Sequence, residues 1–211
     1  TIGVNSDDGF LCWIGDQWMG AATWRGTTNT AMPFTVTTPG VYPIRVLFLE
    51  AGGGANVEVV EVDVCTGNKL VGDPAGRIKV FENGPVPMPP APNPPWVEAI
   101  DPATKVGEVG QGSVSGWTVE MADVDSNVWQ LNQWTDAVNA IASHWPAGIY
   151  PVLGRWTVAS PVVDYPYAST WPDGSAADVN EDFAVRVYGF IELPAAGTYY
   201  LFVASDDGFR A

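Results

Sequence analysis

The sequence predicts a mainly β protein: an antiparallel β-sandwich in two half-modules, joined by a proline-rich spacer and carrying one short helix. Three observations predict this fold. The chain has 23 Gly and 18 Pro among 211 residues, a composition typical of many turns and little helix. Ten Trp, seven Tyr and eight Phe supply large apolar faces for a core. Short runs in which apolar and polar residues alternate recur through the chain, as half-buried strands require.

The division into two half-modules comes from a repeat. The pentapeptide at residues 6–10, Ser-Asp-Asp-Gly-Phe, returns at residues 205–209, an offset of 199 residues from Asp7 to Asp206. At the same offset Val4 aligns with Val203. A fixed period of this kind indicates a repeat architecture. We therefore expect the chain to begin midway through one copy of a module and to end midway through the next, as about one period of a tandem array.

Residues 1–66 form the first segment and are rich in strand patterns. Within residues 40–50, apolar side chains recur at every second position with Arg45 on the opposite face, the period of a strand with one buried face. Three consecutive glycines then favour a turn. The other strands expected in this segment are 1–5, 10–14, 34–37 and 56–65.

A connector and a spacer separate this segment from the rest of the chain. Residues 67–84 predict an extended connector with short strands near 70–73 and 77–81. Seven prolines lie between Pro85 and Pro95. Proline restricts its own φ angle and favours extended geometry in the preceding residue. Residues 85–97 are therefore predicted to be a semi-rigid spacer, and the strongest domain boundary in the chain.

Residues 98–211 form the last segment, with further strands and the one convincing helix. The helix is expected at about 135–143, with Thr135 as its N-cap and Asp136 complementing the positive end. Val138, Ile141 and Ala142 would form its apolar stripe. Strands are expected at 116–121, 184–193 and 198–204, with a turn at 194–197.

The charge balance excludes several kinds of partner. Asp and Glu number 24 against nine Lys and Arg, for a formal net charge of −15 at pH 7. Nucleic acid and anionic membrane surfaces attract basic side chains, so neither is an expected partner. The sequence has no run of 18 apolar residues, and we expect no membrane insertion. This balance suits a surface protein or one that binds cations.

The sequence offers no arrangement of residues typical of an enzyme. The carboxylates of a glycosidase stand about 5 to 9.5 Å apart on either side of a bond, and adjacent aspartates do not. The sole histidine, His144, has no Ser or Cys nucleophile motif to serve. One His and two Cys cannot build a structural zinc site. We therefore expect a protein that is not an enzyme.

Cys12 and Cys65 are the two cysteines, and each lies in a strand-like stretch. We predict a disulfide between them, because the acidic, Trp-rich, Lys-poor composition is what we expect of an exported protein. The alternative is a pair of buried free thiols, since cysteine is among the most buried residue types. An extracellular or cell-surface location is the corresponding expectation.

Three pieces of the sequence together resemble the protective-antigen (PA-14) domain family. They are the strand at 197–203, the following Ala-Ser-Asp-Asp-Gly-Phe at 204–209, and residues 42–56 with their closing Gly-Gly-Gly-Ala-Asn. This family is a β-sandwich of bacterial surface proteins, glycosidase insertions and yeast adhesins. The resemblance implies that residues 1–66 are the C-terminal half of one copy. The N-terminal half of the next would lie within residues 98–211, from about residue 113.

The Asp-Asp-Gly step followed by Phe-Leu-Cys-Trp-Ile-Gly at 10–15 looks like the lectin-type adhesin branch of the family. In that branch two adjacent aspartates chelate a calcium ion that holds sugar hydroxyls. Adjacent strand residues normally point to opposite faces, so both carboxylates can meet one ion only if the backbone is unusual, as with a cis peptide bond between Asp7 and Asp8. Calcium takes six to eight oxygen ligands. The resemblance implies this role for Asp7, Asp8, Asp206 and Asp207. Alternatively, Asp-Asp-Gly is simply a turn.

Two further groups of residues complete the calcium and sugar hypothesis. The adhesins add an Asn ligand from a nearby loop, for which the candidates here are Asn56 and Glu50. Trp18 and Trp24 could stack on a sugar ring or fill the sandwich, whereas Trp13 is expected in the core.

The function predicted from the sequence is a structural and adhesive repeat unit of an extracellular fibre or large cell-surface protein. Its expected partners are neighbouring copies of the same repeat. The alternative is a calcium-dependent carbohydrate-binding module of the lectin type, with calcium as its cofactor.

Overall fold

The computed structural model describes most of the chain outside a set of loops. The proline-rich spacer lies outside the described residues, so the prediction made for 85–97 is not tested. Twelve ranges are described: 2–6, 9–22, 26, 28–50, 55–62, 67–82, 99–112, 114–124, 131, 134–142, 152–165 and 183–205.

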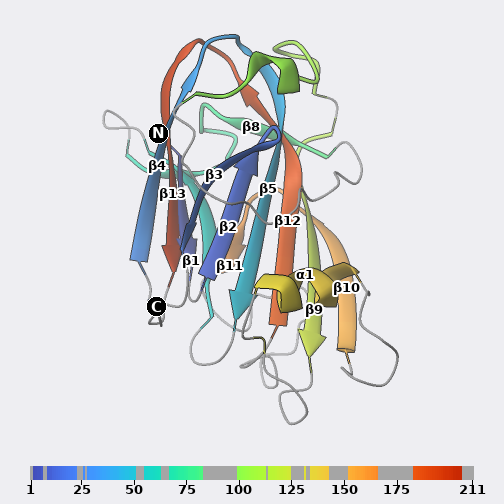
Figure 1. Ribbon diagram of the computed structural model, residues 1–211. Helices are drawn as coiled ribbons and strands as arrows, with labels where there is room; N and C mark the ends of the chain where they lie inside the picture. Colours follow the sequence, from blue (N-terminus) through green and yellow to red (C-terminus); the bar gives the residue numbers. More distant parts are fainter. Residues whose placement is uncertain are drawn as a thin grey trace.

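Two β-sheets pack face to face in the described part of the chain (Figure 1). Every pairing in both sheets is antiparallel except that of β1 with β13. The predicted fold class, a mainly β antiparallel sandwich, is confirmed. Sheet A contains β11 (Asp164–Tyr165), β6 (Val57–Glu61), β1 (Ile2–Ser6), β13 (Gly197–Ser205) and β4 (Thr28–Val36), with β7 (Lys69–Leu70) beside β6. Sheet B runs in the order β10 (Val152–Ser160), β9 (Trp117–Val124), β12 (Phe183–Leu193), β5 (Gly40–Glu50), β2 (Gly9–Ile14) and β3 (Gln17–Ala22), with β8 (Lys79–Phe81) beside β12.

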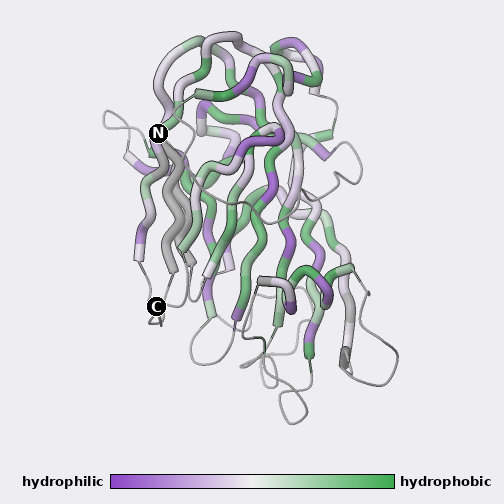
Figure 2. Tube along the Cα trace, in the orientation of Figure 1, coloured by the Kyte–Doolittle hydropathy of each residue, from purple (hydrophilic) through white to green (hydrophobic). Residues whose placement is uncertain are grey.

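Strand β5 is the centre of sheet B and is buried along all eleven of its residues. Its alternate side chains face the space between the sheets, where Tyr42, Ile44 and Phe48 join the main core. Strands β2, β5 and β12 accordingly appear as the apolar centre of the molecule in Figure 2. Burial of apolar surface from both sheets is what holds a sandwich together.

Strands from the two ends of the chain lie side by side in these sheets. Strand β5 pairs with β12 over its whole length, from Phe183 opposite Glu50 to Leu193 opposite Gly40. Strands of residues 1–66 therefore pack against strands of residues 113–211 of the same chain. The physical reason is that β5 and β12 are matched in length and apolar pattern, so each covers the exposed edge of the other.

The outer face of sheet B is covered by α1 (Trp134–Ala142), which lies across β12 and β9 in Figure 1. The helix was predicted one residue later, and Thr135 lies in its first turn instead of capping it. Ala137 and Ala140 are fully buried and belong to a second apolar cluster that also contains Leu11 and Trp13. No helix in the described ranges has the length and apolarity to cross a bilayer.

The predicted connector at 67–84 joins the two sheets at one end of the sandwich. Strand β7 adds to β6 of sheet A, and β8 adds to β12 of sheet B. The Glu61 side chain at the end of β6 is 2% exposed. Its carboxylate accepts hydrogen bonds from the backbone N–H groups of Arg77 at 2.8 Å and Ile78 at 3.0 Å, in the segment between β7 and β8. It also meets the Arg77 Nε at 3.1 Å. This carboxylate therefore anchors the connector to β6.

Cys12 is a free thiol, buried in the core on the inner face of β2. Cys65 lies outside the described residues, so the predicted bridge to it is not tested. Phe10, Ile14 and Val46 surround the position of Cys12 in the same apolar cluster. Burial raises the pKa of the Cys12 thiol far above its ordinary value, so that the thiol stays protonated.

Candidate metal centre at one end of the sandwich

The predicted aspartate step sits where the chain passes from sheet A to sheet B. Strand β1 ends at Ser6, opposite Val57 of β6, and β2 begins at Gly9, opposite Leu49 of β5. Asp7 and Asp8 themselves lie outside the described residues, as does the predicted cis bond between them. Ser6 and Gly9 are three residues apart, which keeps their Cα atoms within about 11 Å of one another.

Glu50 and Asn56 are the residues next to those two partner positions. Glu50 directly follows Leu49 and is fully buried, and Asn56 directly precedes Val57 and is 8% exposed. Asn56 Oδ1 has no hydrogen-bond partner among the described residues. A buried amide oxygen without a donor is costly. Glu50 and Asn56, the two ligand candidates proposed from the sequence, thus lie next to the residues that pair with Gly9 and Ser6, at the ends of the connection from β1 to β2.

Asp123 is a third buried acidic or amide residue at this end, and the sequence did not identify it. Phe183 of β12 stands opposite Glu50 on one side and Asp123 on the other. Strands are spaced about 4.8 Å apart, so the Glu50 and Asp123 backbones lie about 10 Å from one another. Asp123 is 7% exposed. Its only signal in the sequence was an acidic residue at the end of an otherwise apolar strand.

The donor set at this end is made of oxygen ligands. Carboxylate and amide oxygens suit calcium, whereas zinc prefers nitrogen and sulfur. Within the described ranges, no group of three or more His, Cys, Asp or Glu side chains is close enough to hold a metal ion. Glu50, Asn56 and Asp123 fit calcium in chemistry, and a full ligand set would require further oxygens, for which the sequence offers Asp7 and Asp8.

The other residues predicted for the site fall into two groups. Asp206, Asp207 and Trp24 lie outside the described residues. Trp18 on β3 is partly buried and packs on the cluster beneath α1, as does Trp13, which is 2% exposed. The prediction that Trp13 lies in a core is confirmed. Trp18 therefore takes part in this packing, and its predicted role toward a sugar ring is not tested.

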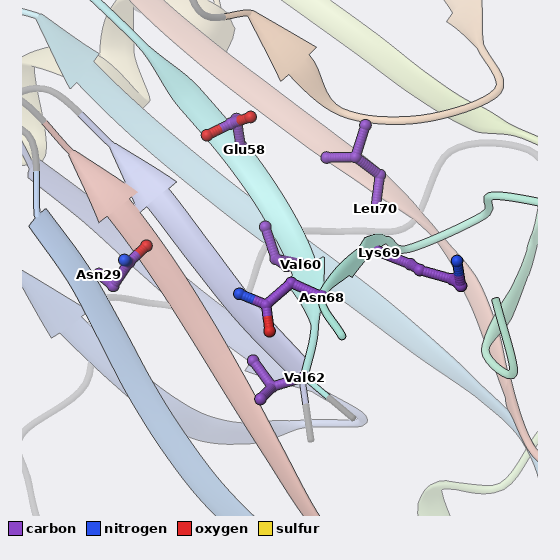
Figure 3. Close-up of a pocket in the computed structure, with 7 residues that line it drawn as sticks. All are labelled: Asn29, Glu58, Val60, Val62, Asn68, Lys69 and Leu70. Atoms are coloured by element: carbon purple, nitrogen blue, oxygen red, sulfur yellow. The ribbon is translucent and has the colours of Figure 1, made fainter. Parts of the chain in front are cut away.

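A shallow hollow of about 400 Å³ lies on sheet A. Figure 3 shows Asn29 on β4 at one side of it and Glu58 and Val60 on β6 at the other, with the backbones of β13 and β1 between them. The hollow therefore spans the width of the sheet between β4 and β6. Its lining residues are Asn29, Glu58, Val60, Val62, Asn68, Lys69 and Leu70.

Glu58 in this hollow is paired with a second carboxyl group. Asp164 of β11 stands directly opposite it. Burial raises the pKa of Glu58, and the nearby charge of Asp164 and a hydrogen bond with it raise that pKa further. The pair can share a proton. Its members are in hydrogen-bond contact, much closer than the carboxylates that flank a glycosidic bond.

A scan against protein-family models, a search of curated proteins and a search of solved structures return no match to this chain.

Proposed function

We propose that this protein is a structural and adhesive repeat unit of an extracellular fibre or large cell-surface protein. The observation that carries the proposal joins the sequence repeat to the structure. The sequence repeats at an offset of 199 residues, and β1 pairs with β13 at that same offset, Gly3 opposite Phe202 and Val4 opposite Val203. The two copies of the repeated sequence thus lie side by side in sheet A, parallel and in register, which supports a structural unit that recurs along a chain.

Three further properties support a repeat with neighbours on either side. The sequence resembles the PA-14 family, in which such sandwiches occur in surface proteins. The proline-rich stretch at 85–97 is of the composition that spaces domains in extended chains. The net charge of −15 favours solvation of a long surface array and disfavours collapse of one unit onto the next.

A tandem protein tests this proposal. Residues 1–199 are placed before residues 1–211, which continues the period without adding foreign sequence. We expect two sandwiches that melt at the temperature of the parent chain, seen by electron microscopy as a two-bead particle. Small-angle scattering should show an elongated shape. A second period that stays unfolded or merges into one collapsed particle would contradict the repeat function.

A second candidate function is calcium-dependent carbohydrate binding, as in the adhesin branch of the PA-14 family. It is supported by the buried Asn56 oxygen, which has no donor among the described residues and lies beside the step from Ser6 to Gly9. Glu50 and Asp123 would hold the ion from sheet B, and Asp7 and Asp8 from the step itself. When bound, calcium supplies positions at which sugar hydroxyl groups can coordinate.

Melting with and without chelator tests the calcium candidate. Calcium at a hundredfold excess over Kd stabilises the folded state by about 2.7 kcal/mol. For a chain of this size that corresponds to about 5 to 10 °C in Tm. Asn56→Ala and the double variant Asp7→Asn, Asp8→Asn should lose this increase. Glu108→Gln, which removes one exposed charge beside Gly107 at the opposite end, should keep it. Equal melting of the parent chain with calcium and with chelator would contradict the calcium site.

Binding of labelled glycans on an array, in calcium and in chelator, then tests the carbohydrate part separately. We expect binding in calcium alone. If the protein binds calcium but no glycan, the calcium site stands and the carbohydrate-binding function is refuted.

A further inference from the structure

Glu58 of β6 and Asp164 of β11 form a close cross-strand pair of acidic residues. The Val59 backbone N–H donates to Val163 O at 3.3 Å, so Val59 and Val163 are a hydrogen-bonded pair of this ladder. The next pair, Glu58 and Asp164, is then of the non-hydrogen-bonded kind, in which Cα atoms lie about 4.5 Å apart and side chains are closer together. Like charges in directly opposite positions destabilise a sheet. This pair is therefore stable only with a proton or a cation between its oxygens.

Both carboxyl groups lie on the outer face of sheet A, the face turned away from sheet B. Val57 and Val59 belong to the core between the sheets, so Glu58 between them projects to the outer face. Asp164 projects to the same side, because residues directly opposite each other in a ladder share a face. Its two neighbours in the chain also belong to the core. The pair is thus presented away from the interior of the sandwich.

Asn56 lies on this same face, two residues before Glu58. Ala55 and Val57 on either side of it pack in the main core, so the Asn56 side chain between them projects to the outer face. Asn56 is nevertheless 8% exposed, and its Oδ1 has no hydrogen-bond partner among the described residues. A buried amide oxygen costs free energy unless a donor or a cation meets it.

The side chains of Asn56, Glu58 and Asp164 are near enough to meet one ion. Residues two apart in a strand have Cα atoms about 6.7 Å apart, and diagonal neighbours such as Asn56 and Asp164 lie about 7 to 8 Å apart. Calcium binds oxygen at about 2.3 to 2.6 Å and takes six to eight oxygen ligands. Two carboxylates and one amide oxygen supply up to about five of these, and water completes the set.

The hollow on sheet A gives an ion access to this face. Glu58 is among its lining residues, and Figure 3 shows the Glu58 carboxylate beside β6. Lys69 is the cationic residue that lines the hollow, and its side chain extends away from Glu58 in the same view. Within the described residues, neither Glu58 nor Asp164 forms an ion pair with a cationic side chain. The negative charge of the pair is therefore available to a bound ion.

We propose that Glu58, Asp164 and Asn56 form a binding site for a divalent cation, and that the ion is calcium. We call these three residues the β6–β11 site. Calcium takes the place of a proton between the two carboxyl groups and meets the Asn56 oxygen. It also ties β11 to the edge of sheet A. Strand β11 has two residues, and in the described part of the chain it pairs with β6 alone, so such a tie would stabilise a weakly held edge.

The β6–β11 site is separate from the calcium candidate at the connection from β1 to β2. Glu50 and Asp123 follow the alternation of core-facing residues in β5 and β9, so they face the space between the sheets. Asn56 is common to both sites, whereas Glu58 and Asp164 belong to the β6–β11 site alone. The β6–β11 site depends neither on the repeat function nor on carbohydrate binding.

Calorimetric titration with calcium chloride tests the site. Glu58→Gln and Asp164→Asn keep the shape of each side chain and remove one charged ligand, so each should weaken binding of this ion at least about tenfold. Glu108→Gln is the matched control. It removes an exposed carboxylate that lies 2.7 Å from Lys105, and it should leave the affinity unchanged.

Amide NMR spectroscopy locates the ion. The backbone N–H signals of Val59 and Asp164 should shift when calcium is added to the parent chain and stay in place in Glu58→Gln. Exchange of the Val59 N–H, which donates to Val163 O, should slow by about tenfold in calcium, because the ion holds β11 in place. The Val71 N–H, which donates to Val59 O from the other side, is the internal control and should change less.

Three results would overturn the β6–β11 site. A parent chain that binds no calcium would refute both calcium sites. Equal weakening by Glu58→Gln and Glu108→Gln would mean that only the net charge matters. If the double variant Asp7→Asn, Asp8→Asn abolishes binding while Glu58→Gln and Asp164→Asn bind as the parent does, the candidate at the connection from β1 to β2 stands and the β6–β11 site fails. The opposite pattern confirms the β6–β11 site and refutes the other candidate.

Discussion

Replacement of Glu61 tests whether a buried carboxylate fixes the connector to β6. Its Oε2 accepts the backbone N–H groups of Arg77 and Ile78, at 2.8 and 3.0 Å, while the Arg77 side chain is 63% exposed. A hydrogen bond to a charged group contributes about 1.5 to 3 kcal/mol, and loss of its partner leaves a buried donor unsatisfied. Glu61→Gln keeps one neutral oxygen for these donors. We therefore expect a loss of about 2 to 3 kcal/mol in the free energy of unfolding.

Arg77→Ala is the matched control, because it removes the exposed half of the same ion pair. Exposed ion pairs contribute up to about 1 kcal/mol. In thermal melts, Glu61→Gln should lower Tm by about 4 to 12 °C and Arg77→Ala by less than about 4 °C. Urea unfolding gives the free energies directly. If the two variants lose equal stability, the ion pair and not the backbone acceptor holds the connector, and the reasoning fails.

Two further predictions concern buried ionisable groups. Burial holds the Cys12 thiol protonated. We therefore expect no alkylation of Cys12 at pH 8.5 in the native protein and rapid alkylation in denaturant, measured by peptide mass mapping. Labelling of Cys12 in the native protein would contradict its burial. Burial also raises the pKa of Tyr199, while its hydrogen bond to the Ala195 backbone and the charge of Arg77 lower it. The neutral phenol is thus favoured in the folded state, so its stabilising contribution is complete below the ordinary tyrosine pKa of about 10 and is lost as pH rises through the higher folded pKa. Urea unfolding between pH 9 and 12 should show a shallower loss of stability in Tyr199→Phe than in the parent, and equal slopes would refute this contribution.

The sandwich was predictable from the sequence because its main strands carry strong local patterns. Residues 40–50 alternate clearly, and the structure forms β5 over those same residues. The short apolar stripe of α1 was equally legible, and its start was displaced by one residue. A start is hard to locate because several side chains near it suit a helix end.

The pairing between distant strands could not be read in the same way. Nothing local in residues 40–50 or 183–193 states that they pair with each other and not with a neighbouring unit. Asp123 was missed for the same reason, since it joins Glu50 only through the register of both strands with Phe183. Glu58 and Asp164 likewise meet through sheet pairing across more than a hundred residues of sequence.

The repeat at Asp7 and Asp206 was visible in the sequence, whereas its structural consequence was not. Identity between two segments shows that they prefer the same surroundings. Only the pairing of β1 with β13 shows that the two repeated segments lie side by side in sheet A.

Cysteine trapping tests this central claim most directly. Gly3→Cys and Phe202→Cys are combined in one chain with Cys12→Ala and Cys65→Ala, because Gly3 and Phe202 are partners in the pairing of β1 with β13. Neighbouring strands lie about 4.8 Å apart, within the Cα range of a disulfide. After mild oxidation, mass spectrometry of the monomer should find positions 3 and 202 linked to each other. A monomer in which both cysteines stay free would contradict the side-by-side placement of the two repeated segments.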